Sequence, residues 1–261
     1  MAAPPRTAPD IAIAARALHT ALADAAVQDG LTLEVRRHEV FALAGPSGCG
    51  KTLLLRQALG LQQPDAGSLE VLGQEVTGLG GAAAVALRRR CGVVFERAAL
   101  FSSLTVAENV EFPLREHTRL GWRLRASLAA MKLALVGLPD GAGAKYPSQL
   151  SGGMRRRAAL ARAIALDPEL LFLDEPSAGL DPESARSFED LIRHLNQQLG
   201  LTVLVVTRDL GLLWNAADRV AFLGRGRVLA SGTMEEVSRS EEPEVRSYFS
   251  GARRGAAGGH A

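Results

Sequence analysis

The sequence predicts an α/β fold with a mostly parallel sheet, an antiparallel β edge and an inserted helical subdomain. From residue 151 onward, apolar strands alternate with helices, an order typical of a parallel sheet covered by helices. Residues 40–44 read as a buried strand that runs directly into a glycine-rich loop and a Leu-rich helix. Residues 97–150 instead have helical apolar spacing, which predicts the inserted helices.

The elements can be assigned in chain order. Strands are expected at residues 31–35, 39–44, 68–72, 91–95, 170–173 and 201–206, and helices at 53–59, 122–136, 154–166 and 182–199. The last helix has clear ends, because Asp181 can cap it, Pro182 suits its first turn and Gly200 can end it.

These elements predict a core built from two separated segments. We expect the core at residues 11–96 and 151–250, the helical subdomain at 97–150, a disordered N-terminus at 1–10 and a flexible tail at 251–261. The N-terminus is rich in Pro and Ala, and the tail is rich in Gly and Ala.

Composition excludes several classes of protein. Lys and Arg number 30 against 28 Asp and Glu, so no excess of positive charge predicts nucleic-acid binding. The two cysteines, Cys49 and Cys91, form no CxxC pair, which argues against a disulfide framework or a zinc site and fits a reducing cytoplasm. The longest apolar stretches fall well short of the roughly 18–20 residues of a membrane-spanning helix. The apolar segment after the N-terminus is interrupted by charged residues, so no export signal is expected.

Residues 45–52, GPSGCGKT, match the Walker A pattern of a P-loop NTPase, with a strand before them and a helix after them. Glycines let backbone N–H groups turn onto phosphate oxygens, and the helix N-terminus adds positive potential. Lys51 is expected to reach the β- and γ-phosphates of ATP, and the Thr52 hydroxyl to ligate Mg²⁺. The expected nucleotide contacts in this loop are Gly45, Pro46, Ser47, Gly48, Cys49, Gly50, Lys51 and Thr52.

Residues 170–176, LLFLDEP, place two acidic residues after an apolar strand, at the edge of an α/β sheet where ligands bind. Asp174 is expected to hold Mg²⁺ through water, and Glu175 to orient and polarise the attacking water. Two acids in such a place are by themselves more often a helix cap or a solvated turn. The P-loop in the same chain favours the catalytic interpretation.

Residues 150–154, LSGGM, open a long helix. Ser151 and the free N–H groups of Gly152 and Gly153 can form an anion site at the helix N-terminus, or Ser151 can simply cap the helix. The position of this motif between the two Walker motifs favours the anion site.

The order of Walker A, helical segment, LSGG, Walker B and SAGLD (residues 177–181) resembles the ATP-binding cassette ATPases over residues 11–250. The resemblance implies two subunits that sandwich two MgATP molecules head to tail, each between one subunit's Walker motifs and the other's LSGG motif. The implied partners are a second ATPase subunit, in a homodimer or heterodimer, and a transmembrane permease subunit.

Other segments, among them residues 108–118 (ENVEFPLREHT) and the signature ending in Met154, resemble the ATPase of the Mla/Mce-type phospholipid transporters. This resemblance implies a peripheral protein at the cytoplasmic face of the inner membrane of diderm bacteria, with substrate-binding and small regulatory subunits as further partners. Residues 244–251, EVRSYFSG, are similar to a C-terminal segment of that family that can reach onto the partner subunit.

Three positions depart from the cassette pattern. Glu96 replaces the Gln that contacts Mg²⁺ and the attacking water, and a carboxylate can still act as a metal ligand there. Arg208 replaces the switch His; it can bind a phosphate but cannot change protonation near neutral pH. Leu22 aligns with the aromatic residue that stacks on adenine, a loss worth about 1–3 kcal/mol. One hypothesis is that Glu96 and Arg208 form an ion pair across the γ-phosphate.

Several alternatives stay open at this stage. The chain could bind ATP but hydrolyse it weakly, serve another transported substrate, or belong to the non-transport cassette ATPases, which usually have tandem cassettes. The basic run at residues 155–157 is interpreted as a solvated helix start, and Trp122 and Trp214 as packing or subunit-contact residues.

Overall fold

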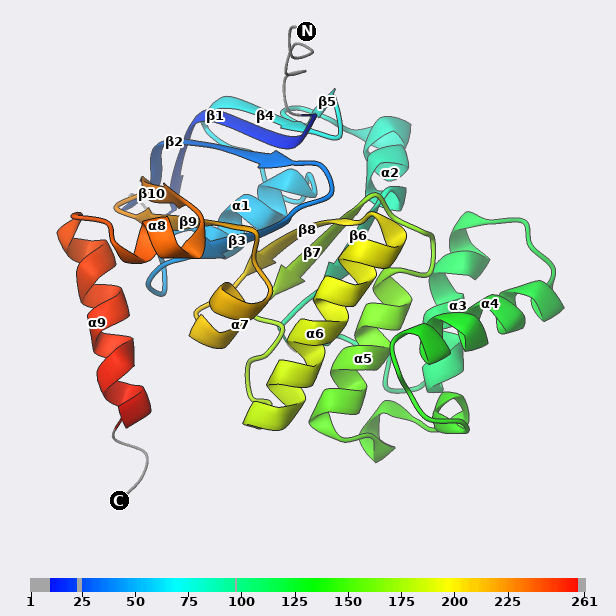
Figure 1. The fold of residues 1–261 in the computed structure, drawn as a ribbon. Coiled ribbons are helices and arrows are strands. Elements are labelled where there is room, and N and C mark those ends of the chain that lie inside the picture. Colours follow the sequence, from blue (N-terminus) through cyan, green and yellow to red (C-terminus); the bar gives the residue numbers. More distant parts are fainter. Residues whose placement is uncertain (1–9, 23–24, 97, 258–261) are drawn as a thin grey trace, which may run out of the picture.

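The computed structural model describes residues 10–22, 25–96 and 98–257, and its centre is a six-stranded sheet in the order β10-β9-β3-β8-β7-β6 (Figure 1). Neighbouring strands are parallel except for β10, which pairs antiparallel with β9 at one edge. The strands are β3 (Val40–Ala44), β6 (Cys91–Val94), β7 (Leu170–Asp174), β8 (Thr202–Val206), β9 (Arg219–Gly224) and β10 (Arg227–Gly232). The predicted α/β fold class is confirmed.

The central strands are apolar at every position because both faces of the sheet are covered. Every residue of β3, β7 and β8 is buried. Val40 and Ala42 belong to a core shared with the helices on one face, whereas Phe41 and Leu43 belong to a core shared with a second sheet on the other. A parallel sheet covered on both sides gives this continuous apolar pattern.

The second sheet is antiparallel, in the order β2-β1-β4-β5. Its strands are β1 (Ile11–Leu22), β2 (Ala25–Arg36), β4 (Ala66–Val71) and β5 (Gln74–Glu75), and the helices that follow β3 and β5 are α1 (Lys51–Ala58) and α2 (Gly81–Arg89). The sequence predicted parts of β2 and β4 but neither β1 nor α2. In β1, Ala12, Ile13, Ala14 and Ala15 are all buried, and the pairing register with β2 shifts at the following residues, where Ala17 has a positive φ.

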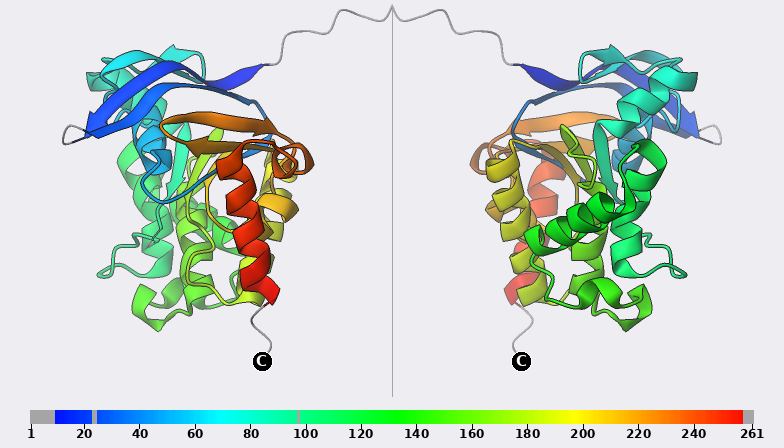
Figure 2. Two further views of the ribbon diagram at one scale, coloured as in Figure 1. Left: turned by 90° about the vertical axis from the view of Figure 1, so that its left-hand side faces the viewer. Right: turned by 90° about the vertical axis from the view of Figure 1, so that its right-hand side faces the viewer.

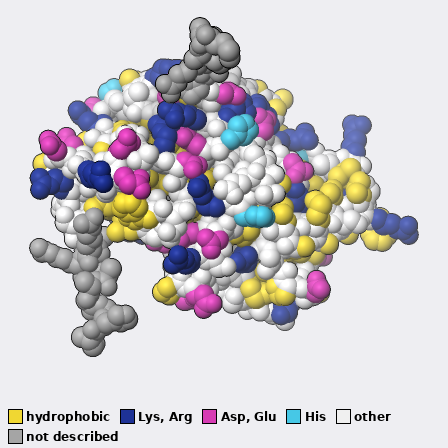
Figure 3. Space-filling view, viewed as in Figure 1, with side chains coloured by type: hydrophobic (Ala, Val, Ile, Leu, Met, Phe, Trp, Pro, Cys, Tyr) yellow, Lys and Arg dark blue, Asp and Glu magenta, His cyan; other side chains and the backbone are white. Residues whose placement is uncertain are grey.

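The helical subdomain lies to one side of the sheet. Its helices are α3 (Val106–His117) and α4 (Trp122–Leu135), with short 3₁₀ turns at Ala142–Ala144 and Pro147–Gln149, and α5 (Gly152–Ala163) packs against both helices. Leu124 and Met131, two residues of the apolar row that predicted α4, are 50% and 51% exposed. Figure 3 shows hydrophobic side chains gathered over this part of the molecule, at the right of the view. The spacing therefore predicted the helix, while much of the row faces outward.

The remaining helices are α6 (Pro182–Leu199), α7 (Leu210–Asn215), α8 (Met234–Ser238) and α9 (Pro243–Ala257). As predicted, the Asp181 side chain accepts a hydrogen bond from the Ser184 N–H at 2.9 Å, and Gly200 ends α6 in the left-handed region. α9 runs along the side of the molecule opposite α3 and α4 (Figures 1 and 2).

α9 continues through Ala257, so the tail expected from residue 251 is helical over most of its length. The Ala and Arg residues of this segment favour helix, which the Gly content had obscured. Residues 1–9 and 258–261, where the disordered N-terminus and the end of the tail were expected, lie outside the described residues. Within the part that is described, no helix combines the length and apolarity needed to cross a bilayer.

Candidate nucleotide-binding site

The glycine-rich loop joins the end of β3 to the start of α1, as predicted. Gly45 has a φ of 142°, and a Cβ atom there would lie 2.2 Å from the carbonyl oxygen of Leu223. Gly50 has a φ of 101° at the N-cap of α1. Only glycine can occupy these two positions without strain, and the turn they allow leaves the first N–H groups of α1 at the loop.

The Lys51 ammonium group lies inside this loop. Its Nζ donates to the carbonyl oxygens of Gly45 at 2.9 Å and Pro46 at 2.8 Å, and the residue is 6% exposed. These bonds satisfy a buried charge at the place where phosphate oxygens are expected. Burial raises the pKa of the neighbouring Cys49 thiol, so Cys49 stays protonated at neutral pH and fills space in the loop.

Thr52 and Asp174 lie together, which supports a metal site. The Thr52 hydroxyl donates to the Asp174 carboxylate at 3.2 Å, and Asp174 is 7% exposed at the end of β7. Burial raises the pKa of Asp174, and the nearby carboxylates of Glu175 and Glu96 raise it further. A divalent cation would relieve this repulsion, and a hydroxyl with a carboxylate suits Mg²⁺, which keeps several of its waters. The residues present therefore fit Mg²⁺.

Glu175 follows Asp174 in a left-handed conformation with a φ of 45°, a strained backbone for a non-glycine residue. Both of its carboxylate oxygens accept hydrogen bonds. Oε1 accepts from Arg208 Nε at 2.9 Å, and Oε2 accepts from the Arg208 N–H at 3.2 Å and from the Thr207 hydroxyl at 3.4 Å. Arg208 also donates through Nη1 to the Ser47 hydroxyl at 3.0 Å, so it connects Glu175 with the phosphate-binding loop.

The hypothesis that Arg208 pairs with Glu96 is wrong. Arg208 forms its ion pair with Glu175, at 2.9 Å. Glu96 is exposed, and its charge acts on Asp174 and Arg156 instead. Its expected roles as metal ligand and catalytic residue stay predictions, as does the contact of Arg208 with a phosphate.

The LSGGM motif begins α5 as expected. The Ser151 hydroxyl accepts a hydrogen bond from the Met154 N–H at 3.2 Å, so Ser151 caps the helix. The motif lies away from the phosphate-binding loop of its own chain: Ser151 and Gly153 line one cavity of about 530 Å³, whereas Lys51 and Thr52 line another of about 250 Å³. The anion site at Ser151, Gly152 and Gly153 stays a prediction.

Leu22 is the last residue of β1, and its side chain lies outside what the structure describes, so its contact with adenine also stays a prediction. Val27 on β2, which the sequence analysis missed, lines the cavity beside Lys51 and Thr52.

Arg156 is a second residue that the sequence analysis missed. It is 7% exposed, and its guanidinium donates to the carbonyl oxygens of Phe95 at 3.0 Å and Ala178 at 3.1 Å. The expectation of a solvated basic run is therefore wrong for Arg156, although Arg155 is exposed. Successive residues on a helix point in different directions, and Arg156 points between two loops.

Comparison with known proteins decides the family. The sequence pattern described as ABC transporter matches residues 28–178, more than half of the chain. The chain belongs to the ABC transporter family. The Walker motifs and LSGGM described above lie within or at the edge of this match, and the chain is an ABC ATPase, the ATP-binding subunit of a transporter.

This ABC ATPase is similar to subunits with different named substrates. It is 42% identical over 228 residues to the intermembrane phospholipid transport system ATP-binding protein MlaF of Haemophilus influenzae, covering 87% of this chain and 86% of MlaF. It is 45% identical over 208 residues to the methionine import ATP-binding protein MetN of Caulobacter vibrioides, covering 80% of this chain and 62% of MetN.

A solved cassette has the same fold. The dimeric structure of the ATP-binding cassette MJ0796, in a post-hydrolysis state bound to ADP and Pi, matches with a TM-score of 0.77 and 28% identity, covering 85% of this chain and 98% of that one.

Proposed function

We propose that this ABC ATPase binds and hydrolyses MgATP between two ATPase chains and powers phospholipid transport by a membrane permease. The similarity to MlaF carries the choice of phospholipid, since it extends over 87% of this chain and 86% of MlaF. The similarity to MetN, at 62% coverage of MetN, leaves more of that relative unmatched.

The arrangement of the Walker residues supports hydrolysis. Lys51 and the N–H groups at the start of α1 would bind phosphate oxygens, and Thr52 and Asp174, which lie within hydrogen-bond distance of each other, would hold Mg²⁺. When bound, Mg²⁺ would neutralise part of the negative charge that develops on the phosphate oxygens. Glu175 orients the attacking water from the end of β7, and Arg208 sets the direction of its carboxylate.

The separation of the two expected anion sites into different cavities supports a dimer. The LSGGM cavity and the phosphate-binding cavity of one chain share no lining residues, which favours a second chain as the source of the LSGGM motif at each nucleotide. The dimeric cassette MJ0796 supports this arrangement. Native mass spectrometry of the purified complex, with a count of distinct ATPase chains, distinguishes a homodimer from a heterodimer.

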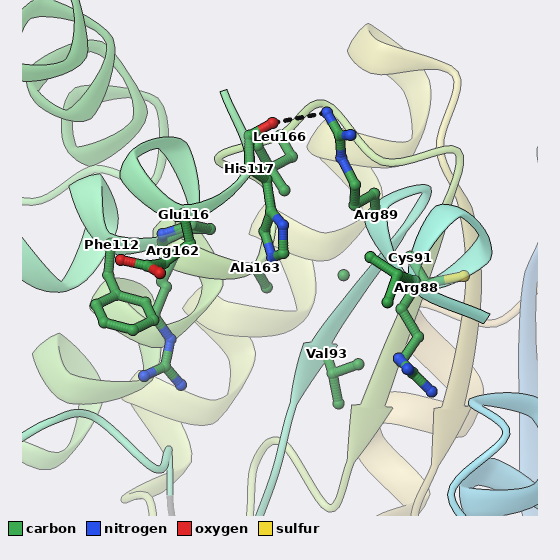
Figure 4. Close-up of a pocket in the computed structure, with 13 residues that line it drawn as sticks. Arg88, Arg89, Cys91, Val93, Phe112, Glu116, His117, Arg162, Ala163 and Leu166 are labelled. Carbon is green, nitrogen blue, oxygen red and sulfur yellow. Dashed lines mark hydrogen bonds between the residues drawn. The ribbon is translucent and has the colours of Figure 1, made fainter. Parts of the chain in front are cut away.

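A groove between the core and the helical subdomain is suited to the permease. It has a volume of about 570 Å³ and lies between α2, β6, α3 and α5. Figure 4 shows Phe112 and His117 on one wall and Cys91 on the other, with Arg89 Nη2 bonded to the His117 carbonyl oxygen across the groove. A short permease segment with acidic and apolar side chains would match this lining. Docking there would place the chain at the cytoplasmic face of the inner membrane as a peripheral subunit.

The experiment is reconstitution of the chain and its co-purifying membrane subunits in liposomes. We expect ATP-dependent transfer of a fluorescent phospholipid between membranes, and no such transfer with Lys51→Ala. ATP-dependent uptake of radiolabelled methionine, without phospholipid transfer, would contradict the proposed substrate while leaving the ATPase role intact.

A second candidate is a subunit that binds ATP and hydrolyses it slowly. The observation that favours it is the Arg208 ion pair, because a carboxylate already bound to a guanidinium is a weaker partner for water. Steady-state hydrolysis by the complex, compared with Glu175→Gln, separates the two candidates. Activity no higher than that of the variant, with ATP binding retained, would support the second.

A further inference from the structure

The C-terminal helix α9 packs beside the nucleotide site. Val245 and Phe249 are buried, and the Tyr248 ring meets Phe222 edge-on, with ring centroids 5.1 Å apart. Phe222 lies on β9 opposite Ala44, the last residue before the phosphate-binding loop. The rings of Phe222, Tyr248 and Phe249 form an aromatic cluster that holds one side of α9 against β9, the strand next to the one that leads into this loop.

The Tyr248 hydroxyl reaches the residues that hold Glu175. It donates a hydrogen bond to the main-chain carbonyl oxygen of Arg208 at 3.3 Å. Burial raises the pKa of Tyr248 to about 12, and the nearby Glu175 carboxylate contributes in the same direction. The hydroxyl therefore keeps its proton at neutral pH and remains a donor.

We propose that Tyr248 is a positioning residue of the hydrolysis site, which holds the Arg208 main chain in the place from which Arg208 directs Glu175. The inference rests on the proposed ATPase function and extends the site to α9. The main-chain N–H and the Nε–H of Arg208 both donate to Glu175, so a shift of the Arg208 peptide moves both donors together.

Thr207 and Asp209, the residues on either side of Arg208, are held by hydrogen bonds that do not involve Tyr248. The Tyr248 hydroxyl therefore acts on the main chain of Arg208 alone. The Thr207 hydroxyl accepts from the Asp209 N–H at 3.0 Å, and Asp209 accepts from the Ser177 hydroxyl at 2.6 Å. Tyr248→Phe keeps the ring and its packing and removes the hydroxyl alone. A purely structural role for the ring predicts no effect of this change on catalysis.

The test compares Tyr248→Phe with Tyr146→Phe, a matched removal of a hydroxyl from a tyrosine that is 46% exposed in the helical subdomain. In the full-length chain without nucleotide, NMR measures solvent exchange of the Arg208 Nε–H, with the signal assigned by its loss in Arg208→Lys. We expect exchange about threefold faster in Tyr248→Phe, as for loss of a weak hydrogen bond, and no change in Tyr146→Phe.

The second measurement is steady-state hydrolysis by the complex with its permease. We expect Tyr248→Phe to lower kcat about threefold with little change in KM for MgATP, and to have no further effect in an Arg208→Ala background. The proposal would be overturned if Tyr248→Phe left the exchange rate of the Arg208 Nε–H unchanged or left kcat unchanged. It would also be overturned if the losses of kcat in Tyr248→Phe and Arg208→Ala were additive in the double variant. If wild type hydrolyses ATP no faster than Lys51→Ala, the ATPase proposal fails, and the exchange rate alone decides whether Tyr248 holds Arg208.

Discussion

Arg156 offers a strong test of how this site is held together, since one side chain joins three segments. It starts from the α5 helix that carries LSGGM, and its two donors reach Phe95, just before Glu96, and Ala178 in the SAGLD loop. The perturbation is Arg156→Met, which keeps most of the side-chain volume and removes both donors.

The expected magnitude follows from the two bonds. Hydrogen bonds from a charged donor contribute about 1.5 kcal/mol each at the low end, or about 3 kcal/mol for both. Burial lowers the pKa of Arg156, which shows that desolvation of the charge offsets part of this gain. We expect a net loss of about 2 kcal/mol, which in a chain of this size lowers Tm by about 4–8 °C.

The assay is thermal unfolding of the full-length chain by circular dichroism, with Arg155→Met as the matched control. Arg155 is the exposed neighbour on the same helix turn, and its loss should change Tm by no more than about 1 °C. A Tm for Arg156→Met within 1 °C of that control would refute the reasoning, because the two carbonyl bonds would then contribute nothing measurable.

Three further outcomes can be measured directly. Lys51→Ala should weaken MgATP binding at least about tenfold in isothermal titration, because it removes a charge-assisted contact to phosphate, and unchanged affinity would contradict the assignment. Glu96→Gln should strengthen ATP binding without Mg²⁺ about twofold, since it removes one of the carboxylates that raise the pKa of Asp174; weaker binding would speak against this. The hydrogen bond from Arg90 lowers the pKa of Glu169 to about 2, below its value in the unfolded chain. The Glu169 carboxylate therefore stabilises the folded state fully above about pH 4.5, and this stabilisation is lost as the pH falls toward 2. Glu169 is 42% exposed, so Glu169→Gln should cost only about 1 kcal/mol at pH 7, and chemical unfolding should show a smaller difference from wild type at pH 3.

The parts of the site that sequence predicted are those that a short segment specifies by itself. The phosphate-binding loop needs glycine at Gly45 and Gly50 for local backbone reasons, and Asp174 is the last residue of a strand whose burial is evident from its apolar residues. The ends of α6 were predictable in the same way from Asp181 and Gly200. In each case neighbouring residues in the chain determine the geometry.

The parts that sequence missed depend on residues far apart in the chain. In the sequence, Arg156 is one of three successive arginines and nothing distinguishes it from the other two. In the structure its guanidinium lies between two loops and donates to a carbonyl oxygen of each. Tyr248 reaches Arg208 only because α9 folds back onto β9. β1 was missed because residues 12–15 are all buried and the pairing register shifts after them, so no alternation of apolar and polar residues is visible in the sequence.

The choice of Glu175 over Glu96 as the partner of Arg208 follows from strand order. β8 lies next to β7, with Asp174 paired to Val206, so the residues that follow the two strands, Glu175 and Arg208, meet at one edge. Glu96 follows β6, which lies on the far side of β7, about 10 Å from β8 at the usual strand spacing. A guanidinium after β8 therefore reaches Glu175 first, and restoring Gln at position 96 should alter the metal site while leaving the Arg208 pair intact.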